Sequence, residues 1–108
     1  EISRDEIINK IKNFKDSGKS ICGYAATSKS TTILNYCRIG DQQIDYICDT
    51  TKEKIGKFSP GMHIPIKDMN YFYKNPTDCV YLFAWNHKEE ILKKEKKNKY
   101  EWFSHVSL

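Results

Sequence analysis

Apolar residues recur along this chain at two spacings, one typical of amphipathic helices and the other of buried strands. Near the N-terminus, Ile7, Ile11 and Phe14 fall three or four positions apart with lysines between them, which predicts an amphipathic helix. Gly18 follows, where a left-handed residue can end such a helix. The predicted helices are residues 5–15, 32–40, 68–73 and 88–97.

Short runs of almost wholly apolar residues lie between the predicted helices. Runs of this length and low polarity are typical of strands buried on both faces, as in a parallel sheet. Residues 78–84 form the most apolar of these runs. The predicted strands are residues 20–26, 44–48, 63–66, 78–84 and 101–106.

The order of these segments indicates an α/β fold. Residues 20–48 follow the order strand, loop, helix, strand, which is a βαβ unit with parallel strands and a right-handed crossover. We therefore predict a Rossmann-like, open, mostly parallel sheet of about five strands with helices on both faces. The chain has 108 residues and contains no repeat or linker-like segment, so residues 1–108 are predicted to form a single domain.

The charge of the chain changes this picture only slightly. Eighteen basic and 14 acidic residues give a formal net charge of +4. This excess is consistent with an anionic ligand and is too small to indicate a nucleic-acid partner. No apolar run approaches the roughly 20 residues of a membrane span, and no signal-peptide pattern opens the chain. A cytoplasmic location without a membrane partner is therefore expected.

The four cysteines lie inside or beside apolar runs, and no two of them form a C-x-x-C pair. Metal knuckles need closely spaced ligands, and disulfide scaffolds usually have denser cysteine. We therefore predict reduced thiols in the core and no metal site. The cysteines are Cys22, Cys37, Cys48 and Cys79.

The segment after the first predicted strand is the first candidate for a binding site, because ligands of open α/β sheets bind outside the carboxyl ends of the strands. Small residues at 23–32 lead into a helix, whose free N–H groups and positive end suit a phosphate. Lys29 adds a positive charge, and Ser28 and Thr31 add hydroxyl donors. The segment has neither a Walker pattern nor a G-x-G-x-x-G fingerprint, so an ordinary capped loop is the alternative interpretation.

Two further segments follow predicted strands. Asp49 stands where an acidic residue accepts the ribose hydroxyls in dinucleotide-binding folds, although an exposed aspartate at a strand end is the alternative. Trp85 offers a flat stacking face, and Asn86 can donate and accept hydrogen bonds or cap the next helix. Neither His63 nor His87 has an acid partner or nucleophile at a recognisable spacing, so no catalytic residue is predicted.

These motifs, taken in order, resemble a known family. GYAATSK at residues 23–29 and LNYC at residues 34–37 are similar to the opening motif of the C-terminal domain of S-adenosylmethionine-dependent C-methyltransferases that act on nucleotide-linked deoxysugars. The similarity continues through residues 44–66 and resumes with WNHKEEI at residues 85–91. The similarity covers residues 19–92. The chain departs from the family at position 25, where the family usually has glycine, at residues 30–31, where it usually has a Gly-Asn pair, and at position 38, which is commonly small.

The resemblance implies a three-part enzyme of which this chain is the last part. An N-terminal zinc region and a central methyltransferase domain would precede it, and the central domain would hold both the base and S-adenosylmethionine. This chain would bind no cofactor itself and would hold the nucleotide-sugar against that upstream domain, so it is expected to be inactive alone. The predicted substrate-binding residues are Tyr24, Ala25, Ser28, Lys29, Thr31, Asp49, Trp85 and Asn86.

Two other functions remain open at this stage. The chain could be an independent module for NAD or another dinucleotide, although the missing glycine fingerprint argues against this. Alternatively, it could be a structural or dimerisation domain that stabilises its neighbour and has no ligand of its own.

Overall fold

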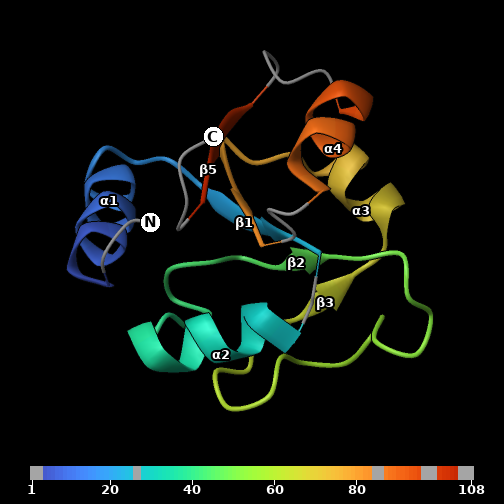
Figure 1. The fold of residues 1–108 in the computed structure, drawn as a ribbon, viewed down its shortest axis with the longest axis horizontal. Coiled ribbons are helices and arrows are strands. Elements are labelled where there is room, and N and C mark those ends of the chain that lie inside the picture. Colours follow the sequence, from blue (N-terminus) through green and yellow to red (C-terminus); the bar gives the residue numbers. More distant parts are fainter. Residues whose placement is uncertain (1–3, 26–27, 84–86, 96–99, 105–108) are drawn as a thin grey trace.

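The structure is a computed structural model that describes residues 4–25, 28–83, 87–95 and 100–104 (Figure 1). The described helices are α1 (Arg4–Asp16), α2 (Ser28–Cys37), α3 (Met69–Lys74) and α4 (Lys88–Lys94). The described strands are β1 (Ile21–Tyr24), β2 (Ile47–Cys48), β3 (Ile66–Lys67), β4 (Cys79–Leu82) and β5 (Glu101–Phe103).

The five strands form one sheet in the order β3-β2-β1-β4-β5, and each neighbouring pair is parallel. The chain builds outward from β1 to β3 and then returns to place β4 on the other side of β1. Helices α1 and α2 cover one face of the sheet, and α3 and α4 cover the other (Figure 1). The predicted Rossmann-like α/β fold is confirmed. Because the strand order reverses beside β1, ligands are expected outside the carboxyl ends of β1 and its neighbours.

Each face of the sheet has its own apolar core. On one face, Ile7 of α1 and Leu34 of α2 pack against the strands. On the other face, Tyr24 of β1 packs edge-on against Phe72 of α3 and tilts against Trp102 of β5. Strands β1 and β4 are buried along their whole length. This two-sided burial explains why their sequences are almost wholly apolar instead of alternating.

Polar contacts join the strands at their amino ends. The backbone N–H and the hydroxyl of Ser20 donate to Oδ2 of Asp78 at 3.0 and 3.3 Å, and the N–H of Asp78 donates to the Ser20 hydroxyl at 3.1 Å. Nearby, Nζ of Lys19 lies 2.9 Å from Oε1 of Glu101. These contacts connect β1 to β4 and β5 at the edge of the sheet that faces away from the expected ligand site.

Two predicted helix boundaries are confirmed. Gly18, two residues after the end of α1, has a φ of 78°, and the N–H of Lys19 donates to the carbonyl of Phe14 at 3.0 Å. This is the bonding of a helix that ends in a left-handed residue. Asp68 caps α3, because its Oδ1 accepts the N–H of Tyr71 at 2.8 Å.

The prediction that the second helix begins at Thr32 is wrong, since α2 begins at Ser28. Hydroxyl residues are weak helix formers, so their local pattern indicated a loop. Burial of Ser30 and Leu34 against the sheet outweighs that weak preference. The helix also ends before the predicted Gly40, because Arg38 adopts a φ of 55° and the N–H of Ile39 donates to the Leu34 carbonyl at 2.9 Å.

The strands are shorter than predicted, although the chain around them still bonds to the sheet. β2 contains only residues 47–48 of the predicted 44–48, yet the N–H of Asp45 donates to the carbonyl of Ile21 at 2.9 Å. β3 lies at the end of the predicted segment 63–66 and extends to Lys67. The predicted strand 101–106 is observed as Glu101–Phe103, and α4 ends at Lys94 instead of residue 97.

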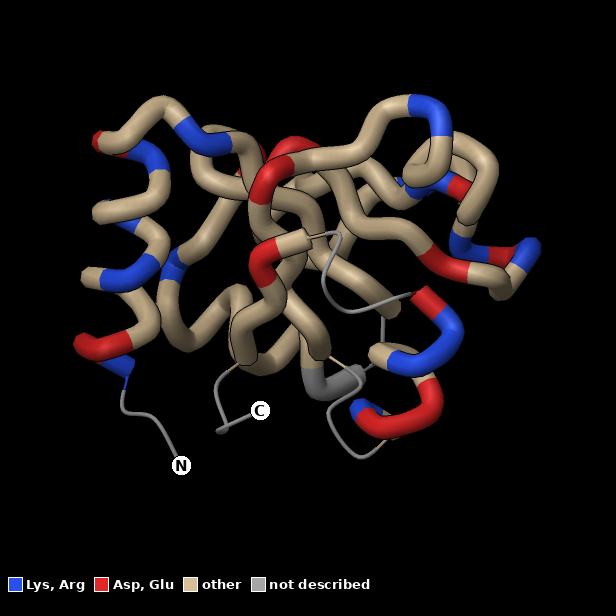
Figure 2. Tube along the Cα trace, turned by 90° about the horizontal axis from the view of Figure 1, so that it is seen from above, with Lys and Arg blue, Asp and Glu red and all other residues tan. Residues whose placement is uncertain are grey.

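Basic and acidic positions are interspersed along the described trace, and α1 has both (Figure 2). All four cysteines are buried and unpaired, as predicted for reduced core thiols. No helix among the described residues has both the length and the apolarity that a membrane span requires.

Candidate functional site

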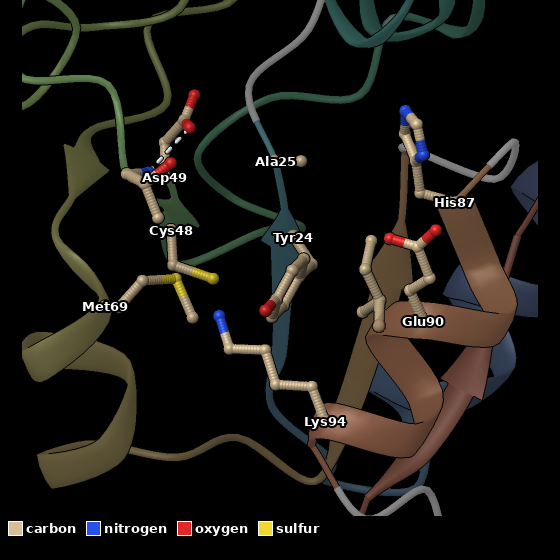
Figure 3. A pocket seen from close by; sticks show the side chains of 10 residues that line it. Tyr24, Ala25, Cys48, Asp49, Met69, His87, Glu90 and Lys94 are labelled. Atoms are coloured by element: carbon tan, nitrogen blue, oxygen red, sulfur yellow. Dashed lines mark hydrogen bonds between the residues drawn. The ribbon is translucent and has the colours of Figure 1, made fainter.

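A pocket of about 320 Å³ opens where β1 and β2 end, between α3 and α4 (Figure 3). This volume is at the low end of the range for small-molecule sites, and it suits one part of a larger ligand. Its wall combines apolar side chains with side chains of both charges. The pocket is lined by Tyr24, Ala25, Cys48, Asp49, Thr50, Met69, His87, Glu90, Ile91 and Lys94.

The backbone turns sharply where β1 reaches the pocket. Ala25 has a φ of 75°, and its N–H donates to the carbonyl of Cys48 at 2.8 Å, which extends the pairing of β1 and β2. A left-handed φ costs a residue with a Cβ about 1–2 kcal/mol. The usual glycine of the family at this position would adopt the same turn without that strain. Ala25 therefore carries backbone strain at the edge of the pocket that a glycine would not.

Asp49 is held in place by the turn that follows it. Its Oδ1 accepts the backbone N–H of Thr50 at 2.7 Å and that of Thr51 at 3.3 Å. Its Oδ2 lies 3.9 Å from Nζ of Lys54. The Asp49 side chain is only 11% exposed, although it lines the pocket. The carboxylate is thus an oriented acceptor at the carboxyl end of β2, as expected for a residue that accepts hydroxyl groups.

Helix α4 supplies one wall of the pocket. His87, Glu90 and Lys94 lie along the side of the helix that faces Tyr24 and Met69 (Figure 3). Sequence reasoning missed Glu90 and Lys94, and it considered His87 only as a residue near this edge. His87 and Glu90 are three positions apart, and Glu90 and Lys94 are four positions apart. This spacing places residues on a single face of a helix, so it could have indicated from the sequence that they lie together. Cys48, Thr50 and Met69 were also missed.

Below the pocket, Tyr24 takes part in a hydrogen-bond network around the buried side chain of Glu95. Its hydroxyl donates to Oε2 of Glu95 at 2.5 Å, and the hydroxyl of Tyr73 donates to the same oxygen at 3.0 Å. Burial and the hydrogen bond to Glu95 raise the pKa of Tyr73 to about 12. The same two causes raise the pKa of Tyr24 further, so both hydroxyls keep their protons and act as donors at neutral pH.

The structure brings three of the predicted site residues together. Tyr24, Ala25 and Asp49 line the same pocket. Ser28 begins α2 and Lys29 follows it, while Thr31 lies half-buried in the same helix. These three therefore belong to the first turns of a helix instead of a preceding loop. Trp85 and Asn86 lie outside the described residues, so their predicted place at this edge stays a prediction.

Gly23, the first glycine of the motif, has a packing role. A Cβ atom at Gly23 would lie 2.4 Å from Cε2 of Phe83 and 3.1 Å from Cγ1 of Ile47. The ring of Phe83 therefore leaves no room for a side chain at this position of β1. A second motif glycine, Gly61, is closed in the same way by Asn35, whose amide donates to the carbonyl of Pro60 at 3.1 Å.

No group of three or more histidine, cysteine or acidic side chains is placed to hold a metal ion within the part of the chain that the structure describes. Burial raises the pKa of the Cys48 thiol, which lines the pocket and donates to the carbonyl of Gly23 at 3.4 Å. A protonated, hydrogen-bonded thiol is a poor nucleophile. Cys48 therefore presents a neutral, hydrogen-bonded thiol to the pocket and not a thiolate.

Comparison with known proteins gives two concordant findings. Residues 1–105 match the family described as the C-methyltransferase C-terminal domain. The chain is also 36% identical over 93 residues to the C-methyltransferase NovU of Streptomyces niveus. This alignment covers 86% of the chain and only 22% of NovU, so the chain spans less than a quarter of the length of that relative. The family match includes the resemblance at residues 19–92 and extends beyond it.

Proposed function

Because this chain belongs to the C-methyltransferase C-terminal domain family, we propose that it holds the substrate of an S-adenosylmethionine-dependent C-methyltransferase that acts on a nucleotide-linked keto-deoxysugar. The observation that carries the proposal is the pocket at the carboxyl ends of β1 and β2, with Asp49 oriented beside it. A Rossmann-like sheet binds its ligand at this edge. Cytoplasmic location is part of the same proposal.

Each part of the site suits a different part of such a substrate. The oriented carboxylate of Asp49 is an acceptor for a sugar hydroxyl. The first turn of α2 contributes the positive end of the helix dipole, which favours a phosphate, and Lys29 in this turn adds a charge. The apolar side chains of Met69 and Ile91 line the pocket and suit the flat face of a base.

The chemistry of methyl transfer is assigned to an upstream domain. S-adenosylmethionine would supply the methyl group from that domain, and Gly23 of the motif serves packing in this chain, because the ring of Phe83 lies where its Cβ atom would be. The base that deprotonates the carbon beside the sugar ketone is likewise assigned upstream. The task of this chain is then to bind the nucleotide-sugar and present it to the upstream domain.

The proposal is tested in the full-length enzyme with Asp49→Asn and Lys29→Ala. Asparagine keeps an oxygen that can accept the N–H groups of Thr50 and Thr51, so the first variant removes charge while it preserves the turn. Loss of a charge-assisted hydrogen bond should raise the dissociation constant of the nucleotide-sugar by about tenfold or more. Lys12→Ala, on the exposed side of α1, is the matched control for loss of a lysine.

Calorimetric titration of each variant with nucleotide-sugar and with S-adenosylmethionine separates the candidate functions. Weaker binding of the sugar nucleotide with unchanged cofactor binding supports the proposal. If both folded variants bind the sugar nucleotide like the wild type, the domain has a structural role instead. Binding of a dinucleotide in place of the nucleotide-sugar would support an independent dinucleotide module.

A further inference from the structure

Glu95 is a buried acidic side chain that the proposed binding of the substrate does not use directly. The residue is only 6% exposed. Its backbone N–H donates to the carbonyl of Ile91 at 2.9 Å and closes the last turn of α4. Its Oε2 accepts the hydroxyls of Tyr24 and Tyr73. One side chain therefore connects α4 to β1 and to α3.

The three connected elements are walls of the same pocket. Tyr24 lines it from β1, Met69 lines it from α3, and Lys94, the neighbour of Glu95, lines it from α4 (Figure 3). The hydrogen bonds to Glu95 hold the C-terminal end of α4 against both other elements. They therefore define the separation of the two helices and the position of the Tyr24 ring.

A purely structural contact would not need a carboxylate at this position. The surroundings are apolar and aromatic, because Tyr24 packs against Phe72 and Trp102. Burying an ionisable group in such surroundings is costly, and replacing such a group together with its buried partners by apolar residues of similar size often gives equal or higher stability. What the two directed hydrogen bonds add is a defined geometry, since a satisfied polar network specifies one arrangement of its members.

We propose that Glu95 is a positioning residue of the nucleotide-sugar pocket and acts through Tyr24 and Tyr73. This inference rests on the proposed function. Glu95 does not contact the substrate; it holds the α4 wall and the Tyr24 ring in the geometry that the substrate fits. Replacing the carboxylate by an apolar group should therefore lower substrate affinity, and removing the orphaned Tyr24 hydroxyl as well should recover stability without recovering affinity.

The test uses the full-length enzyme with Glu95→Leu, Glu95→Gln and Tyr73→Phe. Glu95→Leu should unfold at a lower denaturant concentration than the wild type, because it leaves the buried Tyr24 hydroxyl without its acceptor, and the double variant Glu95→Leu/Tyr24→Phe should recover part of that loss. In both variants the KM for the nucleotide-sugar should rise by about tenfold. The KM for S-adenosylmethionine should not change. Glu95→Gln keeps one oxygen acceptor and should show an intermediate increase. Tyr71→Phe is the matched control for Tyr73→Phe. It also removes a tyrosine hydroxyl from α3, but it leaves both hydrogen bonds to Glu95 in place.

The outcomes separate this inference from the proposed function. If Asp49→Asn weakens substrate binding and Glu95→Leu does not, the pocket is used and the positioning role is refuted. If neither variant affects binding, the proposed function and the positioning role are both wrong. If Glu95→Leu does not fold, Tyr73→Phe tests the positioning role in its place. This variant should fold, because it deletes a single hydroxyl from a residue that is 45% exposed. A positioning role then requires the substrate KM of Tyr73→Phe to rise about threefold over that of Tyr71→Phe.

Discussion

The ring of Phe83 fills the space that a side chain at position 23 would need: a Cβ atom on Gly23 would lie 2.4 Å from Cε2 of Phe83. Gly23 is buried in the central strand β1, and Phe83 directly follows β4, the strand that pairs with it. The contact is therefore part of the packing between the two strands that flank the point of strand reversal. Glycine is required here because of this close approach.

Gly23→Ala should destabilise this chain by about 1–3 kcal/mol, because an added methyl group overpacks a filled core. Urea denaturation measures the change in the free energy of unfolding. The double variant Gly23→Ala/Phe83→Leu should show a favourable interaction between the two changes, since leucine lacks the outer ring atoms that would clash. Simple additivity of the two single effects would contradict this account.

Arg38→Gly should stabilise the chain by about 1 kcal/mol, because Arg38 ends α2 with a φ of 55° and glycine adopts such a φ without strain. Thermal and urea denaturation measure the gain. Arg38→Ala is the control, because it removes the guanidinium and keeps the Cβ atom. An equal gain in the alanine variant would attribute the effect to charge and not to the backbone.

The four thiols should resist alkylation in the folded chain at mildly alkaline pH. Burial raises the pKa of Cys22 and of Cys79 to about 11 and also raises that of Cys37 and Cys48. Only the thiolate reacts with iodoacetamide. Mass spectrometry should find almost no adduct until denaturant is added, after which all four cysteines react. Rapid modification of one cysteine in the folded chain would contradict the burial of that thiol.

Stability should fall in alkaline solution as tyrosines that donate to Glu95 ionise. Burial and Glu95 raise the pKa of Tyr73 from 10.0 to about 12. A group whose pKa is raised on folding contributes stability below its unfolded pKa and loses it as the pH rises through the folded pKa. The free energy of unfolding should therefore decline between pH 10.0 and about 12. Tyr73→Phe should make this decline less steep, and an unchanged slope would exclude the contribution of Tyr73.

The isolated chain should transfer no methyl group. The proposal assigns both the base and the cofactor site to an upstream domain. Incubation with labelled S-adenosylmethionine and a nucleotide keto-sugar measures the transfer directly, with the full-length enzyme as the positive control. Turnover by the pure chain would overturn the division of tasks between the domains.

The order and type of the elements could be predicted from the sequence, because hydrophobic periodicity reports how each local segment is buried. The apolar run at residues 78–84 predicted a buried strand, and β4 is buried along its whole length. Asp49 could be placed at the ligand edge for a related reason, since it follows a strand and the carboxyl ends of parallel strands share one edge of the sheet.

Only the tertiary structure decided how distant segments meet at the pocket. Tyr24 and Glu95 are 71 positions apart, and nothing local to either residue predicts their hydrogen bond. The choice of the α4 face that lines the pocket depends on how the helix packs on the sheet, so Glu90 and Lys94 were missed. The start of α2 at Ser28 was missed for the same reason. Local propensities are small energies per residue, and the burial of a whole helix against a sheet outweighs them.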